Sequence, residues 1–146
     1  MNLRHIGVTV VDMEKSLKLY KDYFGFNVVW DELEQGDFID NLSDEKQIKV
    51  RTVKMKDTNG GMVELLQYYS HPGTTSKDLE NHIDKIMKVG CSHFALTVNN
   101  VDKTYNELKK MGLKFNCKPQ VSPNSKAKVC FCRDFDGTLI ELVEEL

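Results

Sequence analysis

The sequence lacks the features that define several large classes of protein. No apolar run approaches the ~20 residues that a membrane-spanning helix needs. The first residues, MNLRHIG, have neither the apolar core nor the cleavage site of a signal peptide. A net charge of -2 offers no basic surface for nucleic acid. We therefore expect a cytoplasmic protein that binds neither nucleic acid nor membranes.

The sequence has four cysteines and no CxxC pair. A chain of 146 residues can bury enough apolar surface to fold without disulfides. Cys130 and Cys132 would point to the same side of a strand, either as a thiolate pair for a metal or, more typically, as buried apolar side chains. We expect reduced thiols at all four positions, Cys91, Cys117, Cys130 and Cys132.

One pattern, in contrast, occurs twice. Residues 3–25 read as a short strand, an amphipathic helix and a terminal glycine, and residues 91–112 repeat this order. The first copy carries His5 and the second His93, each seven residues before the side chain expected to cap the helix. Alternating apolar residues predict the strands, and apolar residues at i, i+3 and i+7 predict the helices. The chain therefore reads as two similar halves, each with a histidine on its first strand.

The two helices have recognisable ends. Asp12 and Asn100 suit the N-cap, and Gly25 suits the left-handed position that ends the first helix. The residues expected on the buried helix faces are Leu17, Tyr20 and Phe24 in the first half and Val101, Tyr105, Leu108 and Met111 in the second.

Each half continues with three further strands. Asn59-Gly60-Gly61 and Asp136-Gly137 predict hairpin turns between the last two strands of each half. Residues 34–46 are polar and irregular, and they fit either a loop or a short helix. The expected strands are 26–33, 48–55 and 62–68 in the first half and 113–119, 126–134 and 137–146 in the second. Residues 70–90 connect the halves, with a helical segment at 79–88 and two histidines, His71 and His82, that we expect to be solvated.

Two glutamates stand in the middle of otherwise apolar strands. Glu64 and Glu141 each lie four residues after a hairpin glycine, where a charge is costly unless it is paired or binds a metal. The two-residue period of a strand points them away from their apolar neighbours, to the face expected for His5 and His93. Two imidazoles and two carboxylates suit one divalent ion of Ni, Co, Zn, Mn or Fe. The alternative is a solvent-facing sheet surface with incidental histidines, and the recurrence of all four residues argues against it.

Small residues follow each histidine on the same face. A glycine or alanine stands two residues further on and a threonine four residues further on, which would leave space beside a metal. Arg4, Arg51 and Arg133 could anchor an acidic substrate, although a surface salt bridge is the commoner role of such residues. A tyrosine at the end of the glutamate strand could line a pocket or only close the connector. The candidate pocket residues are Thr9, Thr97, Arg51 and Tyr68.

In this order and repeated, the segments HIGVTVVDMEKSLKLYKDYFGF, GGMVELLQY, SHFALTVNNVDKTYNELKKMGLKF and DFDGTLIELVEEL resemble the vicinal oxygen chelate superfamily of glyoxalases, bleomycin-resistance proteins and extradiol dioxygenases. The resemblance covers essentially the whole chain. It implies an α+β fold of two βαβββ modules, whose curled mixed sheets surround a metal site with helices outside. We expect one domain over residues 1–146, with module 1 at 1–69, a connector at 70–90 and module 2 at 91–146. We also expect a homodimer that acts on a small molecule.

Carried over by position, the resemblance implies His5, Glu64, His93 and Glu141 as ligands of one divalent metal ion. This set looks most like glyoxalase I, with methylmalonyl-CoA epimerase close by. The implied chemistry is proton transfer next to a carbonyl through a metal-stabilised enediolate, with Glu141 or Glu64 as the base.

The sequence departs from glyoxalase I at two positions. Thr9 stands where those enzymes typically carry an arginine that helps to hold glutathione, and Tyr68 replaces an asparagine. Both departures argue against a glutathione adduct as substrate. Two other functions stay open: an Fe(II) extradiol-type dioxygenase, for which Glu64 would be a surplus ligand, and a non-catalytic protein that binds an antibiotic or another small molecule.

Overall fold

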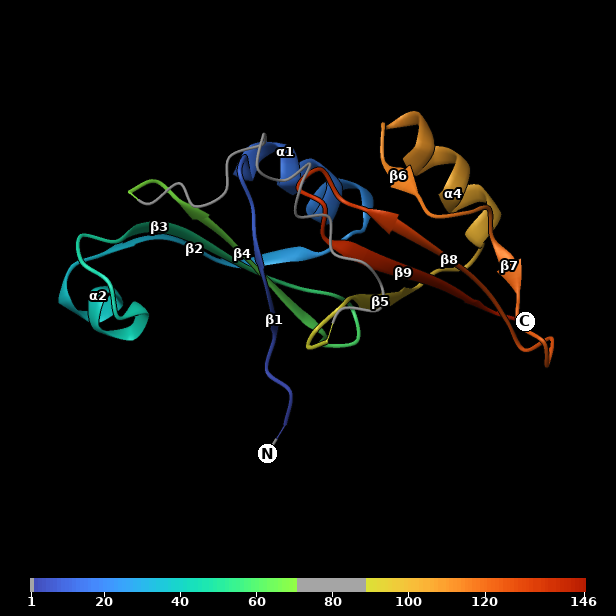
Figure 1. The fold of residues 1–146 in the computed structure, drawn as a ribbon, viewed down its shortest axis with the longest axis horizontal. Helices are drawn as coiled ribbons and strands as arrows, with labels where there is room; N and C mark the ends of the chain where they lie inside the picture. Colours follow the sequence, from blue (N-terminus) through green and yellow to red (C-terminus); the bar gives the residue numbers. More distant parts are fainter. Residues whose placement is uncertain (1, 71–88) are drawn as a thin grey trace. The chain divides into compact units, whose positions relative to one another are not determined.

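The computed structural model describes residues 2–70 and 89–146. The chain divides into two compact units, Met1–Asn81 (unit 1) and His82–Leu146 (unit 2). Each unit contains one mixed β-sheet with a helix packed on one of its faces (Figure 1). The predicted α+β fold is therefore confirmed. The predicted helix at 79–88, His71 and His82 lie outside the described residues.

Unit 1 follows the predicted order of strand, helix and three strands. Its sheet has the order β1-β4-β3-β2, with β1 parallel to β4 and the other pairs antiparallel. Because β1 and β4 run parallel, no tight hairpin can join them, and the chain leaves β1 through the helix before the other three strands form. The elements are β1 (Ile6–Thr9), α1 (Met13–Leu17), the π-helix η1 (Lys18–Tyr23), β2 (Asn27–Gln35), α2 (Asp37–Ser43), β3 (Lys49–Lys56) and β4 (Met62–Tyr68).

The helix of unit 1 begins where the sequence predicts and then changes its pitch. The Asp12 side chain accepts a hydrogen bond from the Lys15 amide at 3.0 Å. In η1 the Phe24 amide donates to the Leu19 carbonyl five residues earlier, so the helix has more residues per turn than an α-helix. The fully buried residues are Met13 and Ser16 of α1 and Leu19 and Tyr20 of η1. Of the predicted face only Tyr20 is fully buried, because Leu17 and Phe24 turn partly outward.

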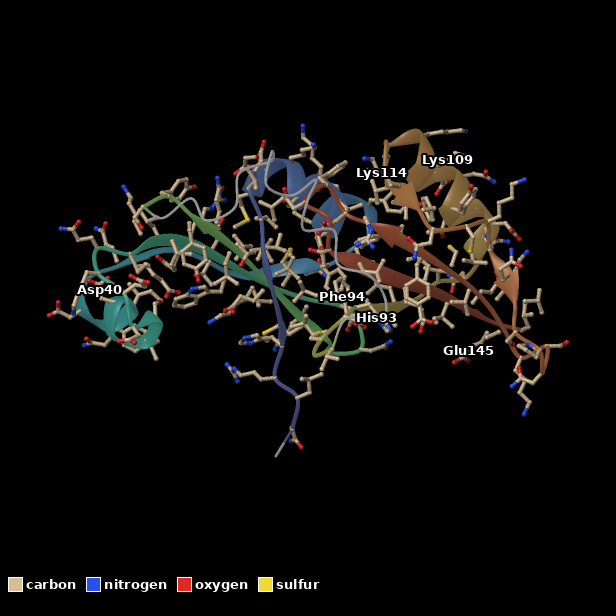
Figure 2. The ribbon with its side chains drawn as sticks, viewed as in Figure 1. Asp40, His93, Phe94, Lys109, Lys114 and Glu145 are labelled. Atoms are coloured by element: carbon tan, nitrogen blue, oxygen red, sulfur yellow. The ribbon has the colours of Figure 1, made fainter. Side chains whose placement is uncertain are left out.

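Residues 34–46 complete a strand and form a short helix. The strand β2 extends to Gln35, and α2 follows it directly. Asp40 on α2, labelled in Figure 2, is buried. Its two carboxylate oxygens accept from the amides of Gln47 and Ile48 at 2.9 and 2.8 Å. These bonds tie the helix to the residues just before β3. Of the two structures that the sequence allowed for this segment, a loop or a short helix, the short helix is observed.

Unit 2 repeats the plan with shorter links. Its sheet has the order β5-β9-β8-β6, with β5 parallel to β9 and with β7 paired to β8. The Asn100 side chain caps its helix by accepting from the Lys103 amide at 2.8 Å. The elements are β5 (Phe94–Thr97), α4 (Val101–Lys110), β6 (Lys114–Phe115), β7 (Gln120–Val121), β8 (Ala127–Arg133) and β9 (Leu139–Glu145).

Two predictions for unit 2 differ from the structure. Residues 113–119 do not form one strand, because the chain leaves β8 after β6 and returns to it only at β7. Met111 is 37% exposed rather than buried, since it stands at the C-cap where the helix ends. Val101 and Leu108 are fully buried as predicted.

In both hairpins an aspartate side chain accepts hydrogen bonds from backbone amides of the turn. Asp57 in unit 1 accepts from the amides of Asn59 and Gly61, both at 2.8 Å. Asp134 in unit 2 accepts from the amides of Asp136 and Thr138 at 3.0 and 2.8 Å. The glycine of each turn, Gly60 or Gly137, has a φ of 90° or 95°, which favours a residue without Cβ. Both predicted turns are confirmed.

The buried cysteines belong to the core of unit 2. Cys130 and Cys132 alternate along β8 and are almost completely buried. Burial raises the pKa of Cys130 to about 11 and that of Cys132 to about 12, so both stay protonated thiols at neutral pH. Their interpretation as apolar core residues is confirmed. Among the residues that the structure describes, none of the helices has the length and apolar character needed to cross a membrane.

Candidate metal centre

In unit 1, the predicted histidine and glutamate lie side by side. Glu64 is in the middle of β4, paired with Gly7 of β1. His5 directly precedes β1 rather than lying within it, so the prediction of a histidine on the strand is wrong by one residue. The His5 Nε2 atom is 3.1 Å from Glu64 Oε2. The pairing of β1 with β4 therefore brings His5 and Glu64 together, although they are far apart in the sequence.

Unit 2 repeats this pair at the equivalent positions. Glu141 is in the middle of β9, and His93 directly precedes Phe94, the first residue of β5 (Figure 2). The His93 Nε2 atom is 3.4 Å from Glu141 Oε2. The ring of Phe131 on β8 contacts the His93 imidazole edge to face, with 5.2 Å between ring centroids.

The two histidines differ in what supports their second nitrogen. His93 Nδ1 is 2.8 Å from the hydroxyl oxygen of Ser92. His5 Nδ1 is buried and has no hydrogen-bond partner among the described residues. A metal-ligating imidazole is normally held by a hydrogen bond to its other nitrogen. The pair in unit 2 meets that condition.

Each glutamate points away from the core of its own unit. Val63 and Leu65, which flank Glu64, are buried, and so are Ile140 and Leu142, which flank Glu141. The glutamates themselves are partly exposed, 13% for the Glu64 side chain and 25% for Glu141. The predicted separation into a core face and a glutamate face is present in both sheets.

Three of the four predicted pocket residues share a face with a glutamate of their own unit. In the parallel pairs, Thr9 lies opposite Leu66 and Thr97 opposite Val143, two positions beyond the glutamate in each strand. Tyr68 lies four positions beyond Glu64 on β4 and is half-buried. A Cβ atom added at Gly7 would be 4.0 Å from Glu64 Oε2, so the small residue leaves room beside the carboxylate.

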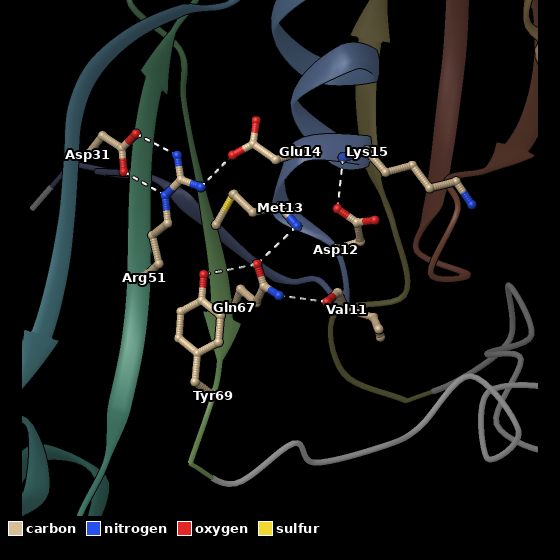
Figure 3. Close-up of polar contacts among 9 residues, drawn as sticks. All are labelled: Val11, Asp12, Met13, Glu14, Lys15, Asp31, Arg51, Gln67 and Tyr69. Carbon is tan, nitrogen blue, oxygen red and sulfur yellow. Dashed lines mark hydrogen bonds and ion pairs between the residues drawn. The ribbon is translucent and has the colours of Figure 1, made fainter.

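Arg51 lies on the opposite face of the sheet from Glu64. Lys54, not Arg51, is the β3 residue paired with Glu64, and Arg51 stands three positions before Lys54, so its side chain points to the other face. The Arg51 guanidinium donates to both carboxylate oxygens of Asp31 at 2.8 Å and to Glu14 at 2.6 Å (Figure 3). The hydrogen bonds from Arg51 lower the pKa of Asp31, and those to Asp31 and Glu14 raise the pKa of Arg51. Because these carboxylates occupy the guanidinium, we leave Arg51 out of the proposed site.

The structure also shows repeated contacts that the sequence analysis missed. Gln67 on β4 accepts from the Met13 amide at the start of α1 at 3.1 Å and donates to the Val11 carbonyl (Figure 3). Glu144 on β9 accepts from the Val101 amide at the start of α4 at 2.8 Å. Both residues lie three positions after the candidate ligands, Glu64 and Glu141. The repeat in the sequence therefore already contained the signal for these contacts.

The pairs have the chemistry and spacing of metal ligands. Imidazole nitrogen and carboxylate oxygen bind ions such as Zn²⁺ at about 2.1 Å, so two neighbouring ligands of one ion lie about 3.0–3.4 Å apart. The distances of 3.1 and 3.4 Å match this separation. Each unit offers two such ligands, and no group of three or more His, Cys, Asp or Glu able to hold a metal occurs within residues 2–70 and 89–146.

The chain is matched by the model of the Glyoxalase/Bleomycin resistance protein/Dioxygenase superfamily over residues 2–142. The protein therefore belongs to this superfamily. It is 31% identical over 150 residues to the uncharacterized protein YraH of Bacillus subtilis, with 100% of both chains covered. It is 27% identical over 148 residues to the lactoylglutathione lyase of Schizosaccharomyces pombe, which covers 98% of this chain and 47% of that enzyme.

Among solved structures, a glyoxalase family protein from Bacillus cereus has the same fold. The two structures align with a TM-score of 0.87 and 18% sequence identity, and the alignment covers 100% of this chain and 95% of the Bacillus cereus chain. This comparison supports the fold.

Proposed function

We propose that the protein is a metal-dependent lyase or isomerase of the glyoxalase I type, which moves a proton next to a carbonyl group. The observation that carries this proposal is the histidine–glutamate pair that recurs at equivalent positions of the two units, with nitrogen–oxygen distances of 3.1 and 3.4 Å. The relationship to a lactoylglutathione lyase supports the same reaction class.

One divalent ion of Ni, Co, Zn, Mn or Fe would take His5, Glu64, His93 and Glu141 as its ligands. Such an ion supplies a Lewis acid for the carbonyl oxygen and for the negative charge that develops there when the neighbouring proton leaves. Imidazole and carboxylate groups suit these borderline and hard ions.

Glu141 is the better candidate for the base. The Glu64 carboxylate is held from two sides, by His5 at 3.1 Å and by the Lys54 ammonium at 3.4 Å. Glu141 is the more exposed of the two, and His93 is its ion-pair partner among the described residues. A carboxylate held by fewer partners can approach a substrate proton at a lower cost, so we assign proton transfer to Glu141 and a fixed ligand role to Glu64.

The substrate in this proposal is a small molecule, and the protein acts as a homodimer. Thr9, Thr97 and Tyr68 are proposed to border the substrate because they share a face with the glutamates. Thr9 cannot provide the charged contact that an arginine gives to a carboxylate of glutathione. We therefore propose a substrate that has no glutathione moiety.

The test combines metal analysis with proton exchange. Elemental analysis of the purified chain should find one divalent ion per chain, and His5→Ala and Glu141→Ala should each lower that content. The metal-loaded protein should exchange the α-proton of 2-hydroxy- or 2-oxo-thioesters and acids with deuterated water. Unchanged metal content in both variants would show that the site assignment is wrong, and two ions per chain would show that each pair binds its own ion.

One observation favours a second function. If Lys54 keeps Glu64 from binding the ion, the remaining ligands are His5, His93 and Glu141, the two-histidine, one-carboxylate set of non-haem Fe(II) oxygenases. Oxygen consumption with catechol and Fe(II), without proton exchange, would support a dioxygenase function rather than a lyase function.

A further inference from the structure

Lys54 stands in the same cross-strand row as Glu64. In unit 1 the row runs across the sheet from Gly7 on β1 to Glu64 on β4, then to Lys54 on β3 and Trp30 on β2. Residues paired across a sheet lie on one face. Lys54 is therefore on the same side of the sheet as the candidate metal ligand.

The contacts of Lys54 divide the Glu64 carboxylate between two partners. Glu64 Oε2 faces His5, and Oε1 is 3.4 Å from Lys54 Nζ. The ammonium also lies 5.9 Å from the centre of the Trp30 ring. Its side chain is 29% exposed, so it stays accessible to a ligand at this face. An ammonium has three donors, and one contact with Glu64 leaves donors for another acceptor.

The net charge of the proposed site also favours a further acceptor for Lys54. Two carboxylates balance one divalent ion, and the imidazole ligands are neutral when they bind a metal. Lys54 then adds one positive charge that no proposed ligand balances. Attraction between this excess charge and an anion is strongest where both are partly withdrawn from water.

We propose that Lys54 binds an anionic group of the substrate, so that the substrates are 2-hydroxy or 2-oxo carboxylates rather than neutral carbonyl compounds. The inference rests on the proposed function, and it names the substrate class for the same site. The equivalent position of unit 2 is Phe131, an apolar residue against His93. The anion is therefore recognised by unit 1.

The single tryptophan of the chain provides a direct measurement. Because Trp30 lies beside Lys54, its fluorescence should change when a ligand binds there. Titration of the metal-loaded protein with lactate and with lactamide compares a carboxylate with its neutral amide of nearly the same shape. We expect lactate to bind more tightly than lactamide.

Lys54→Met should weaken lactate binding about tenfold and leave lactamide binding unchanged, since one charge-assisted hydrogen bond is lost. Lys54→Arg should keep most of the lactate affinity. Lys56→Met is the matched control, because Lys56 is an exposed lysine on the same face of the same strand. It should bind both ligands as the unaltered protein does.

A second measurement separates anion binding from a purely structural role. Removing a positive charge beside the metal should make Lys54→Met bind Zn²⁺ more tightly by several-fold in calorimetry. If Lys54 only held Glu64 in place, the variant would bind Zn²⁺ more weakly and would lose both ligands equally, which overturns the inference. Equal lactate affinity in Lys54→Met and the unaltered protein also overturns it while the proposed function stands. An unaltered protein that binds no metal overturns the proposed function and this inference with it.

Discussion

The two units support their helices in the same way and differ beside their glutamates. In each unit the last strand holds the first amide of the helix, through Gln67 or Glu144. In each unit a cation on the preceding strand pairs with an acidic residue of the first helical turn, Arg51 with Glu14 in unit 1 and Lys128 with Asp102 in unit 2. In both units these contacts hold the first turn of the helix on the mixed sheet.

The residues that pair with the two glutamates, in contrast, differ in their chemistry. Glu64 has Lys54 beside it and Glu141 has Phe131. Lys54 and Phe131 both lie on the face of their sheet that carries the glutamate, away from the helix. The difference lies next to the proposed ligands: Glu64 has a lysine beside it in unit 1, and Glu141 has an aromatic ring beside it in unit 2.

The largest expected effect separates the roles of the two glutamates. Measured at saturating metal, Glu141→Gln should lower the rate of α-proton exchange by about 10²–10⁴-fold, the range for loss of a general base. Glu64→Gln should mainly lower metal affinity, and saturating metal should restore much of its exchange rate. Exchange into deuterated water and elemental analysis, run side by side, check both. The assignment of the base to unit 2 fails if the two variants show the reverse pattern.

The sequence predicted the repeated elements because their signals are local. Caps at Asp12 and Asn100, turns at Gly60 and Gly137, and the two-residue period around Glu64 and Glu141 depend only on neighbouring residues. The histidine–glutamate pairs followed because the repeat itself placed them at equivalent positions.

The remaining features depend on packing or on strand register. The π-helix of residues 18–23 adds a residue to a turn, and no local pattern marks it. The side of the sheet on which Arg51 lies follows from its register with β4, which no local pattern in the sequence reveals. The position of Lys54 beside Glu64 has the same cause, since only the pairing of β3 with β4 places the two residues opposite each other.

A second comparison concerns the aspartates of the two hairpins. Asp134 is buried, with 7% of its surface exposed, whereas Asp57 is half-buried. Each accepts two backbone amides, and hydrogen bonds to a charged acceptor contribute about 1.5–3 kcal/mol each. Asp134→Ala should therefore lower the free energy of unfolding by about 3 kcal/mol and Asp57→Ala by about half as much, in urea titrations. Equal losses would show that burial does not distinguish the two turns.

The buried thiols make unit 2 sensitive to alkaline pH. The folded-state pKa of Cys132 is raised to about 12, above the value of about 8.5 for an unfolded thiol. The protonated thiol therefore contributes stability that is fully present below about pH 8.5 and is lost as the pH rises towards 12, by about 2 kcal/mol at pH 10. Cys132→Val should reduce this loss, and urea titrations of the two proteins at pH 8 and pH 10 measure it. An identical alkaline loss in both would assign the effect to other groups.

The smallest effects concern the ion pairs that hold the helices. Arg51→Met should cost about 1 kcal/mol and Lys128→Met less, because the partners of both cations are largely exposed and such pairs contribute little. Since Arg51 lowers the pKa of Asp31, the stability from that pair is present above the unfolded pKa of Asp31 and is lost as the pH falls through the folded value. The difference in stability between Arg51→Met and the unaltered protein should therefore shrink in acid below about pH 4. Both variants should keep the metal affinity and proton exchange of the unaltered protein, because both cations lie on the helix face. A loss of exchange in Arg51→Met alone would return Arg51 to the site and would mean that unit 1 contributes a second cation to substrate binding.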